Sequence, residues 1–189
     1  MQKIYHLVKY LAVFSLVLIS TSCTAYKVAV DKRTLGAQVD DEHITMSIRN
    51  CFLSDKAIKF FDISVYCYEG HVYLVGEYET NVEKHHAINC AKKVKGVRKV
   101  TTYLLPKVTA ERCGTMDNLK LKALVQAELV KDKDIRSTNI EIKALQCNIV
   151  LLGIVGSKKQ AQLAVSHARH VKGVKKVVSF LRIRPRNTQ

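Results

Sequence analysis

Apolar residues near the middle of the chain follow first a helical and then a strand-like period. Ile44, Ile48 and Phe52 recur every four residues, which predicts the buried face of a helix. Over residues 63–68 apolar and polar side chains alternate, which predicts a half-buried strand. Glu69-Gly70 is a turn signal, so we expect a hairpin into a second strand over 72–77.

A second helix and a third strand complete this pattern. Residues 81–94 place Ala87, Ala91 and Val94 on one helical face, and Gly96 is a typical residue just after a helix. Apolar residues return over 97–104 as a last strand. This order predicts an α+β module, αββαβ, in which two helices cover one face of a small three-stranded sheet.

The chain contains this pattern twice. The stretch 94–100, VKGVRKV, returns seventy-seven residues later as VKGVKKV over 171–177. An ungapped match of this kind marks two tandem modules. Cys147-Asn148 replaces Gly70-His71 at the second hairpin, so we expect that turn to be built differently. The second set of elements is expected over 119–132, 138–143, 149–155, 158–171 and 174–184.

The N-terminal residues have the layout of an export signal. Lys3 and Lys9 precede an apolar run over 10–19, and small residues then lead to Cys23. The run is shorter than the roughly 20 residues that span a bilayer. A cysteine after small residues resembles a bacterial lipobox, which would make Cys23 the lipidated first residue, whereas an ordinary signal cleaved nearby is the alternative. Thr24 follows Cys23 at the position where an Asp would resemble an inner-membrane retention signal, so the outer membrane is the favoured location.

These segments divide the chain into a signal, a tether, two modules, a linker and a tail. The tether lacks clear periodicity, and Asp40 or Asp41 is expected to N-cap the first helix. The expected ranges are 1–22 for the signal, 23–39 for the lipidated tether, 40–105 and 117–184 for the modules, 106–116 for the linker and 185–189 for the tail.

Positive charge is concentrated in the second module. The whole chain carries a formal net charge of +15, but residues 40–105 hold nine basic and nine acidic side chains. Residues 117–182 hold thirteen basic and five acidic side chains, which would attract a polyanion. Because the signal predicts export, anionic lipid or an envelope polymer is favoured over nucleic acid, which we exclude as a partner.

The first helix of the second module presents apolar residues on the side opposite its core face. Leu119, Ala123 and Val130 form this outward strip, which suits a helix lying at an anionic membrane surface. Packing against the first module, or scattered surface exposure, is the alternative. The corresponding helix of the first module has Asp40 and Asp41, which would repel such a surface. The predicted phospholipid-binding residues are Leu119, Lys120, Lys122, Ala123, Val130, Lys131 and Lys133.

The remaining cysteine and histidine residues give no firm site. We assign Cys51 and Cys67 to core packing. Cys113 and Cys147 could form a disulfide in an oxidising compartment, and the sequence does not decide whether they do. His86 and Cys90 have the i, i+4 spacing of metal ligands, but an exposed polar helix face is favoured over a metal site. No catalytic set or phosphate loop is recognisable, so we expect no enzyme activity, no cofactor and no metal.

The repeated VKG motif, the hydrophobic-Leu-x-Gly strand and the αββαβ order resemble the BON domain, which occurs in pairs in bacterial envelope proteins. The stretch 31–41 resembles the segment that precedes the first BON domain of certain outer-membrane lipoproteins. The resemblance implies a non-enzymatic lipoprotein on the periplasmic face of the outer membrane. It also implies a role in outer-membrane integrity through binding of anionic phospholipid, with phosphatidylglycerol the expected lipid.

One residue departs from the family pattern. The lipid-facing helix of such lipoproteins carries a Trp, and Lys120 occupies that place here. Other envelope proteins remain candidate partners. A periplasmic module that binds protein or peptidoglycan, or acts like a chaperone, and is anchored only by its lipid, is therefore the alternative function.

Overall fold

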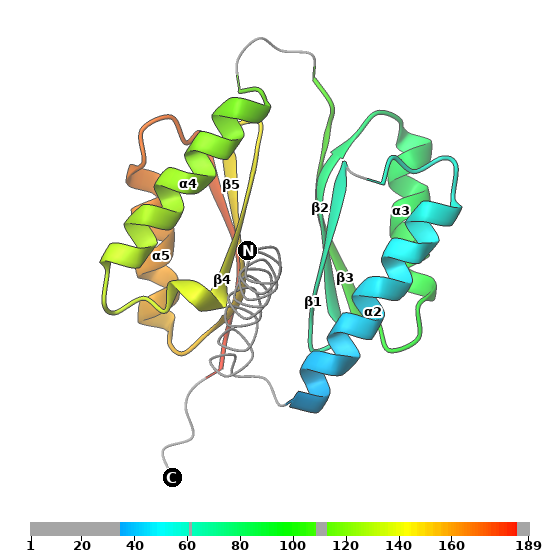
Figure 1. The fold of residues 1–189 in the computed structure, drawn as a ribbon, viewed down its shortest axis with the longest axis horizontal. Coiled ribbons are helices and arrows are strands. Elements are labelled where there is room, and N and C mark those ends of the chain that lie inside the picture. The colour runs from blue at the N-terminus through cyan, green and yellow to red at the C-terminus, as the bar shows by residue number, and fades with distance from the viewer. Residues whose placement is uncertain (1–34, 61, 109–112, 185–189) are drawn as a thin grey trace, which may run out of the picture. The chain divides into compact units, whose positions relative to one another are not determined.

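Two αββαβ modules follow one another along the chain (Figure 1). The computed structural model describes residues 35–60, 62–108 and 113–184, and all of these belong to one compact unit. The predicted signal over 1–22, Cys23 and the tail over 185–189 lie outside the described residues.

The first module consists of α2 (Leu35–Ser54), β1 (Ile63–Tyr68), β2 (His71–Tyr78), α3 (Asn81–Lys93) and β3 (Lys99–Pro106). The second module consists of α4 (Thr115–Lys131), the 3₁₀ turn η1 (Ser137–Asn139), β4 (Ile140–Leu145), β5 (Asn148–Val155), α5 (Lys158–His170) and β6 (Lys176–Ile183).

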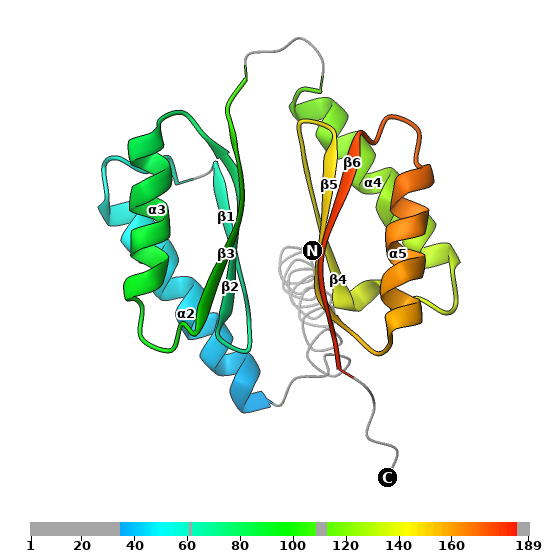
Figure 2. The same ribbon diagram turned by 180° about the vertical axis from the view of Figure 1, so that it is seen from behind.

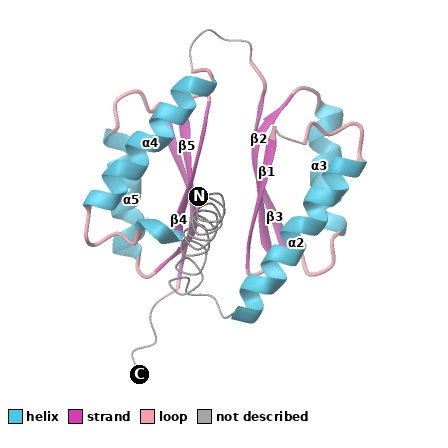
Figure 3. Cartoon of the chain, in the orientation of Figure 1, coloured by secondary structure: helices cyan, strands magenta, loops and turns pink. Residues whose placement is uncertain are grey.

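Each module has a mixed three-stranded sheet covered on one face by its two helices, which confirms the predicted fold class (Figure 3). β1 and β2 pair antiparallel through the hairpin, and β3 returns parallel to β2 after the α3 crossover. β4, β5 and β6 repeat this arrangement. A parallel pair needs a long crossover connection, which explains why a helix separates the second and third strands in both copies.

The crossover helices begin at the same capping motif in both modules. The Thr80 hydroxyl accepts a hydrogen bond from the backbone N–H of Glu83 at 3.1 Å, and a Glu83 carboxylate oxygen accepts one from the N–H of Glu79. At the start of α5 the Ser157 hydroxyl likewise accepts the N–H of Gln160, and the Gln160 side-chain oxygen accepts the N–H of Gly156. In both helices the N-cap side chain thus satisfies a backbone N–H of the first turn, and the side chain three residues later accepts the N–H of the residue before the cap.

Each module has its own core between the helices and the sheet. The predicted helix positions Ile44, Ile48 and Phe52 are buried in the first module. In the second, the equivalent Leu121, Val125 and Leu129 are buried against strand residues such as Ile142, Ile149 and Leu151.

The two sheets contribute to a third apolar cluster. It combines Tyr73 and Val75 of β2 with Val150 and Leu152 of β5, all of which are buried. The rings of Tyr73 and Phe180 lie 5.3 Å apart between centroids. Strands β2 and β5 are therefore apolar on both faces, as expected for strands with no solvent-facing side.

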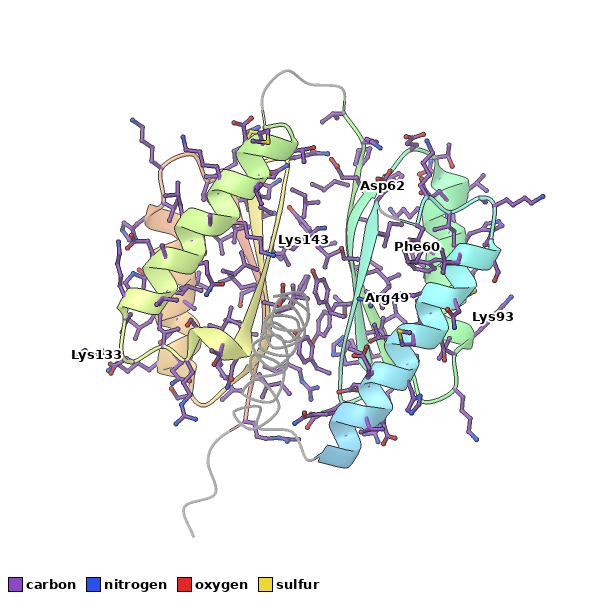
Figure 4. All side chains as sticks on the ribbon, viewed as in Figure 1. Arg49, Phe60, Asp62, Lys93, Lys133 and Lys143 are labelled. Atoms are coloured by element: carbon purple, nitrogen blue, oxygen red, sulfur yellow. A yellow bond between two sulfur atoms is a disulfide. The ribbon has the colours of Figure 1, made fainter. Side chains whose placement is uncertain are left out.

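Polar side chains connect the same two sheets. Lys143 of β4, labelled in Figure 4, donates a hydrogen bond to the Ser64 hydroxyl of β1 at 3.0 Å. Burial lowers the pKa of this lysine. The Gln146 amide donates to a carboxylate oxygen of Glu77 at 2.6 Å, and Arg182 donates to the carbonyl oxygen of Tyr68 at 2.8 Å.

The first helix starts earlier than the sequence predicted. α2 begins at Leu35, so neither Asp40 nor Asp41 is its N-cap, and the last residues of the expected tether are helical. Asp41 is 3% exposed and its carboxylate accepts hydrogen bonds from the backbone N–H groups of Glu69 and Gly70, at 2.7 and 2.8 Å. The Cys67 thiol also donates to it at 3.1 Å. Asp41 therefore supports the β1–β2 turn and not its own helix.

The second hairpin turn is built like the first, contrary to expectation. Glu69 and Gly70 have φ of 56° and 72°, and Gln146 and Cys147 have φ of 49° and 59°. Both turns thus place two consecutive residues in the left-handed region, as type I′ hairpins require. Asn118 stands where Asp41 stands in the first module, and its side-chain oxygen accepts the N–H of Cys147 at 3.0 Å. The change from Gly70 to Cys147 did not change the turn because a side-chain acceptor holds it.

Replacing the Asp41 side chain should destabilise the first module. Asp41→Ala leaves the buried N–H of Gly70 without an acceptor, and we expect a loss of about 2 kcal/mol in the free energy of unfolding. Urea unfolding followed by circular dichroism measures this loss. Asp40→Ala, which removes the exposed neighbouring carboxylate, is the control. Equal stability of the two variants would contradict the role given to Asp41.

Two disulfides stabilise the modules. Cys113 and Cys147 are bonded, with their Cα atoms 5.3 Å apart, so the pairing left open by the sequence is present. Cys51 is bonded to Cys90 and thereby joins α2 to α3. Its assignment to core packing alone was wrong, because spacing along the chain does not show that two helices bring these sulfur atoms together. Cys67 is buried and takes part in neither of these disulfides, as predicted for a core residue.

Candidate functional site

The candidate site lies on α4, which begins one turn before the predicted start at residue 119. Gly114 is the N-cap residue, and its backbone N–H donates to the Asp117 carboxylate at 3.1 Å. The Asn118 amide donates to the Cys113 carbonyl oxygen at 3.3 Å. The disulfide at Cys113 thus ties the start of α4 to the β4–β5 turn.

An apolar line runs along the outer side of this helix. Met116, Leu119 and Val130 are 76%, 60% and 62% exposed. Ala123 and Ala127 lie between them and are also exposed. Successive members are three or four residues apart, so they share one helical face, away from the buried Leu121, Val125 and Leu129. We call these five exposed residues the α4 stripe.

Lysines border the α4 stripe, and two of them have acidic partners. Lys131 donates to Glu128 at 2.6 Å, and the Lys122 amine lies 3.7 Å from Glu141. The Lys131 hydrogen bond holds the pKa of the Glu128 carboxyl below its ordinary value, so this partner is ionised at neutral pH. The ion pairs offset part of the positive charge at this edge of the helix.

Lys120 and Lys133 differ from these two paired lysines. Both are exposed, and among the described residues neither has a carboxylate oxygen within 4.0 Å. Figure 4 shows Lys133 pointing outward from the loop that follows α4. These two residues are therefore the strongest cationic elements beside the stripe.

All seven residues predicted from the sequence are exposed on or next to α4, and their role in lipid binding stays a prediction. Sequence reasoning missed Met116 because it began the helix too late, and Gly114 followed three residues later by Asp117, an N-terminal capping pattern, is the signal that could have found it. It also missed Ala127, which lies within the predicted helix and follows Ala123 by four residues, so the helical period alone places it on the same face.

The first module carries a related but differently charged face. Val39, Met46 and Leu53 of α2 are 56%, 49% and 63% exposed. Their exposed acidic neighbours are Asp40 and Glu42. Asp41, which the sequence analysis included among the repelling charges, is buried at the turn instead. This face still favours an anionic surface less than α4 does.

The histidine and the cysteine weighed as metal ligands have other partners. Cys90 is in a disulfide, and the His86 ring nitrogen Nδ1 lies 2.7 Å from an Asp55 carboxylate oxygen. Across the part of the chain that the structure describes, no three His, Cys, Asp or Glu side chains are grouped as a metal site would need.

Two tandem αββαβ modules with paired VKG motifs define a class of small repeat proteins. The chain belongs to the BON-domain family, whose profile matches residues 40–105 and 117–185. This finding confirms the predicted pair of BON domains. None of the helices in the described ranges combines the length and apolar character needed to cross a bilayer.

Three curated relatives match over most of their length. The outer membrane lipoprotein DolP of Haemophilus influenzae is 30% identical, covering 87% of this chain and 85% of that protein. The osmotically-inducible protein Y of Escherichia coli is 28% identical, with 82% and 79% covered. The 21 kDa hemolysin of Actinobacillus pleuropneumoniae is 27% identical, with 80% and 78% covered. The family and these relatives indicate an envelope protein with BON domains.

Proposed function

We propose that this protein is a non-enzymatic lipoprotein that supports the outer membrane by binding anionic phospholipid through α4. Cys23 carries the lipid anchor, at the periplasmic face, and phosphatidylglycerol is the expected lipid. The observation that carries this proposal is the α4 stripe with lysines on its borders. The name of the Haemophilus relative, an outer membrane lipoprotein, supports the location.

The chemistry of the stripe suits the boundary between lipid headgroups and acyl chains. Apolar side chains such as Met116 and Leu119 enter the boundary, while lysines bury their methylene stems and keep the amine among the phosphates. Each basic residue near an anionic surface contributes about 1 kcal/mol. Because the contribution is electrostatic, salt should weaken it.

Attachment would then occur at two points. Two membrane signals, a lipid and a polybasic surface, hold a protein more stably than either signal alone. The acyl chains on Cys23 keep the second module close to the bilayer, and α4 orients it. The lipid contact is thus a property of the second module, because the first module is neutral overall.

Co-sedimentation with vesicles tests the proposal. A soluble chain of residues 24–189 is mixed with phosphatidylglycerol-containing or neutral vesicles at low and high salt. We expect binding to the anionic vesicles only, and loss of that binding in high salt. Absence of binding to both would leave Cys23 as the membrane contact and refute the role of α4.

Charge reversal on α4 localises the contact. We expect Lys120→Glu combined with Lys133→Glu to weaken binding to anionic vesicles about thirtyfold or more, because at least two basic contributions are lost. Lys122→Glu and Lys131→Glu should each have a smaller effect, since these lysines already face carboxylates. The control is Lys92→Glu with Lys93→Glu on α3, which changes the net charge equally in the first module. If the control weakens binding as much, the surface is not on α4.

A further inference from the structure

A groove of about 460 Å³ lies between α5 and β6, separate from the α4 stripe. Figure 2 shows α5 alongside β6. One face of α5 lines the groove with residues spaced by three and four, and Ser179 from the middle of β6 forms part of its floor. Nothing in the proposed lipid contact uses this groove.

Small side chains keep the groove open in the second module. Ala161 and Ser179 line it, and Ser179 is exposed although its neighbours Val177 and Leu181 pack on the core. In the first module the place of Ala161 is taken by Lys84, whose amine lies 5.1 Å from the centroid of the Tyr78 ring. The first module thus has a long charged side chain where the second has a small one.

The strand beside the groove has a free edge. β6 pairs with β5 on one side, and within the described residues its sheet ends there, in the order β4-β5-β6. The backbone N–H of Leu181 is directed at the Ser179 hydroxyl, 3.4 Å away. Since N–H groups of alternate residues point to the same side of a strand, those of Val177 and Ser179 also face the open edge. Such an edge is a template for another strand.

The groove is positively charged at both ends. Lys158 lies at the start of α5, and Arg169 lies at its end, after which Lys176 begins β6. All three side chains are exposed. No acidic side chain lines the groove within the described ranges. Its middle is apolar, with Ala161 and Val165. An occupant that fits has an extended backbone, acidic side chains and small apolar side chains.

We infer that the α5–β6 groove of the second module binds an extended acidic peptide segment of another protein, which adds to the edge of β6. Main-chain hydrogen bonds supply affinity in strand addition, and pockets for alternate side chains supply specificity. Here the apolar side chains lie over Ala161 and Val165, and the carboxylates face Arg169 and Lys158. A lipid headgroup would use the cations but not the strand edge.

The binding test uses the chain of residues 24–189 and a fluorescein-labelled peptide of alternating Glu and Val. We expect fluorescence anisotropy to show saturable binding, and amide NMR signals of β6 and α5 to shift. A peptide of alternating Lys and Val should not bind. An N-methylated Glu-Val peptide that cannot pair as a strand should bind at least about tenfold more weakly. Equal binding of the N-methylated peptide would overturn strand addition.

Two variants test the location. Ala161→Lys places the first module's residue in the groove, and Arg169→Glu reverses a charge at its end. Each is expected to weaken peptide binding about tenfold without loss of the folded NMR spectrum. Lys84→Ala in the first module is the matched control and should leave affinity unchanged. Unaltered binding by both groove variants refutes the inference. The inference is also refuted if phosphatidylglycerol vesicles shift the β6 amide NMR signals and the peptide does not.

Discussion

Gly153→Ala is expected to lower the free energy of unfolding by about 3–4 kcal/mol, because overpacking and an unfavourable φ act together. A Cβ atom at this position would lie 2.0 Å from the backbone oxygen of Asn139, and φ is +134°. The oxygen belongs to the backbone, so no rotamer change relieves the contact. This glycine is the last residue of the hydrophobic-Leu-x-Gly strand motif, which therefore reflects a close approach of the chain before β4.

In the first module, Gly76 is the corresponding position at which only glycine fits without a backbone clash. A Cβ there would lie 2.0 Å from the backbone oxygen of Asp62, so Gly76→Ala should also be strongly destabilising. Gly36→Ala is the control, because nothing lies within 4 Å of the added methyl group. In the helix this change should be neutral or stabilising by up to about 1 kcal/mol. Urea unfolding of the three variants measures the effect, and a loss below about 1 kcal/mol for both strand glycines would contradict it.

Reduction of the two disulfides is expected to destabilise each module by about 2–4 kcal/mol. The bonds join residues 39 and 34 positions apart, so each closes a long loop in the unfolded chain. In the second module the bond also fixes Cys147, a non-glycine residue with positive φ. Its reduction should therefore loosen the β4–β5 turn as well.

Urea unfolding with and without reductant measures this effect on identical chains. The double variants Cys51→Ala with Cys90→Ala, and Cys113→Ala with Cys147→Ala, assign the loss to one module each. Cys67→Ser is the control, because it keeps a hydrogen-bond donor beside Asp41 and breaks no disulfide. Unfolding midpoints that do not change with reductant would show that the bonds contribute nothing.

The order of helices and strands could be predicted because both modules show the same hydrophobic periodicity in sequence. Ile63, Val65 and Cys67 alternate with polar residues, and the structure buries these three. The start of α2 could not be predicted in the same way. An aspartate before a helical pattern is a local capping signal. Asp41 instead serves a turn twenty-eight residues later in the sequence, a partner that local patterns do not contain.

The candidate site was predictable in its outline but not in its charge. The helical period alone places Leu119, Ala123 and Val130 on the side opposite the core. Whether a lysine there is free or paired depends on Glu128, one turn away, and on Glu141 in another element. The latter pairing arises from the packing of α4 over β4, so a count of charges along the sequence overstates the attraction of this face.

Cys67 is also significant for oxidation of the chain. It stands between Cys51 and Cys90 in the sequence, so an oxidant that joined cysteines in their order of emergence would form the wrong pair. The native bond instead joins α2 to α3, and the Cys67 thiol lies buried in the core beside Asp41. We therefore expect correct pairing in the first module to depend on the docking of these two helices, whereas in the second module Cys147 is the next cysteine after Cys113 in the sequence.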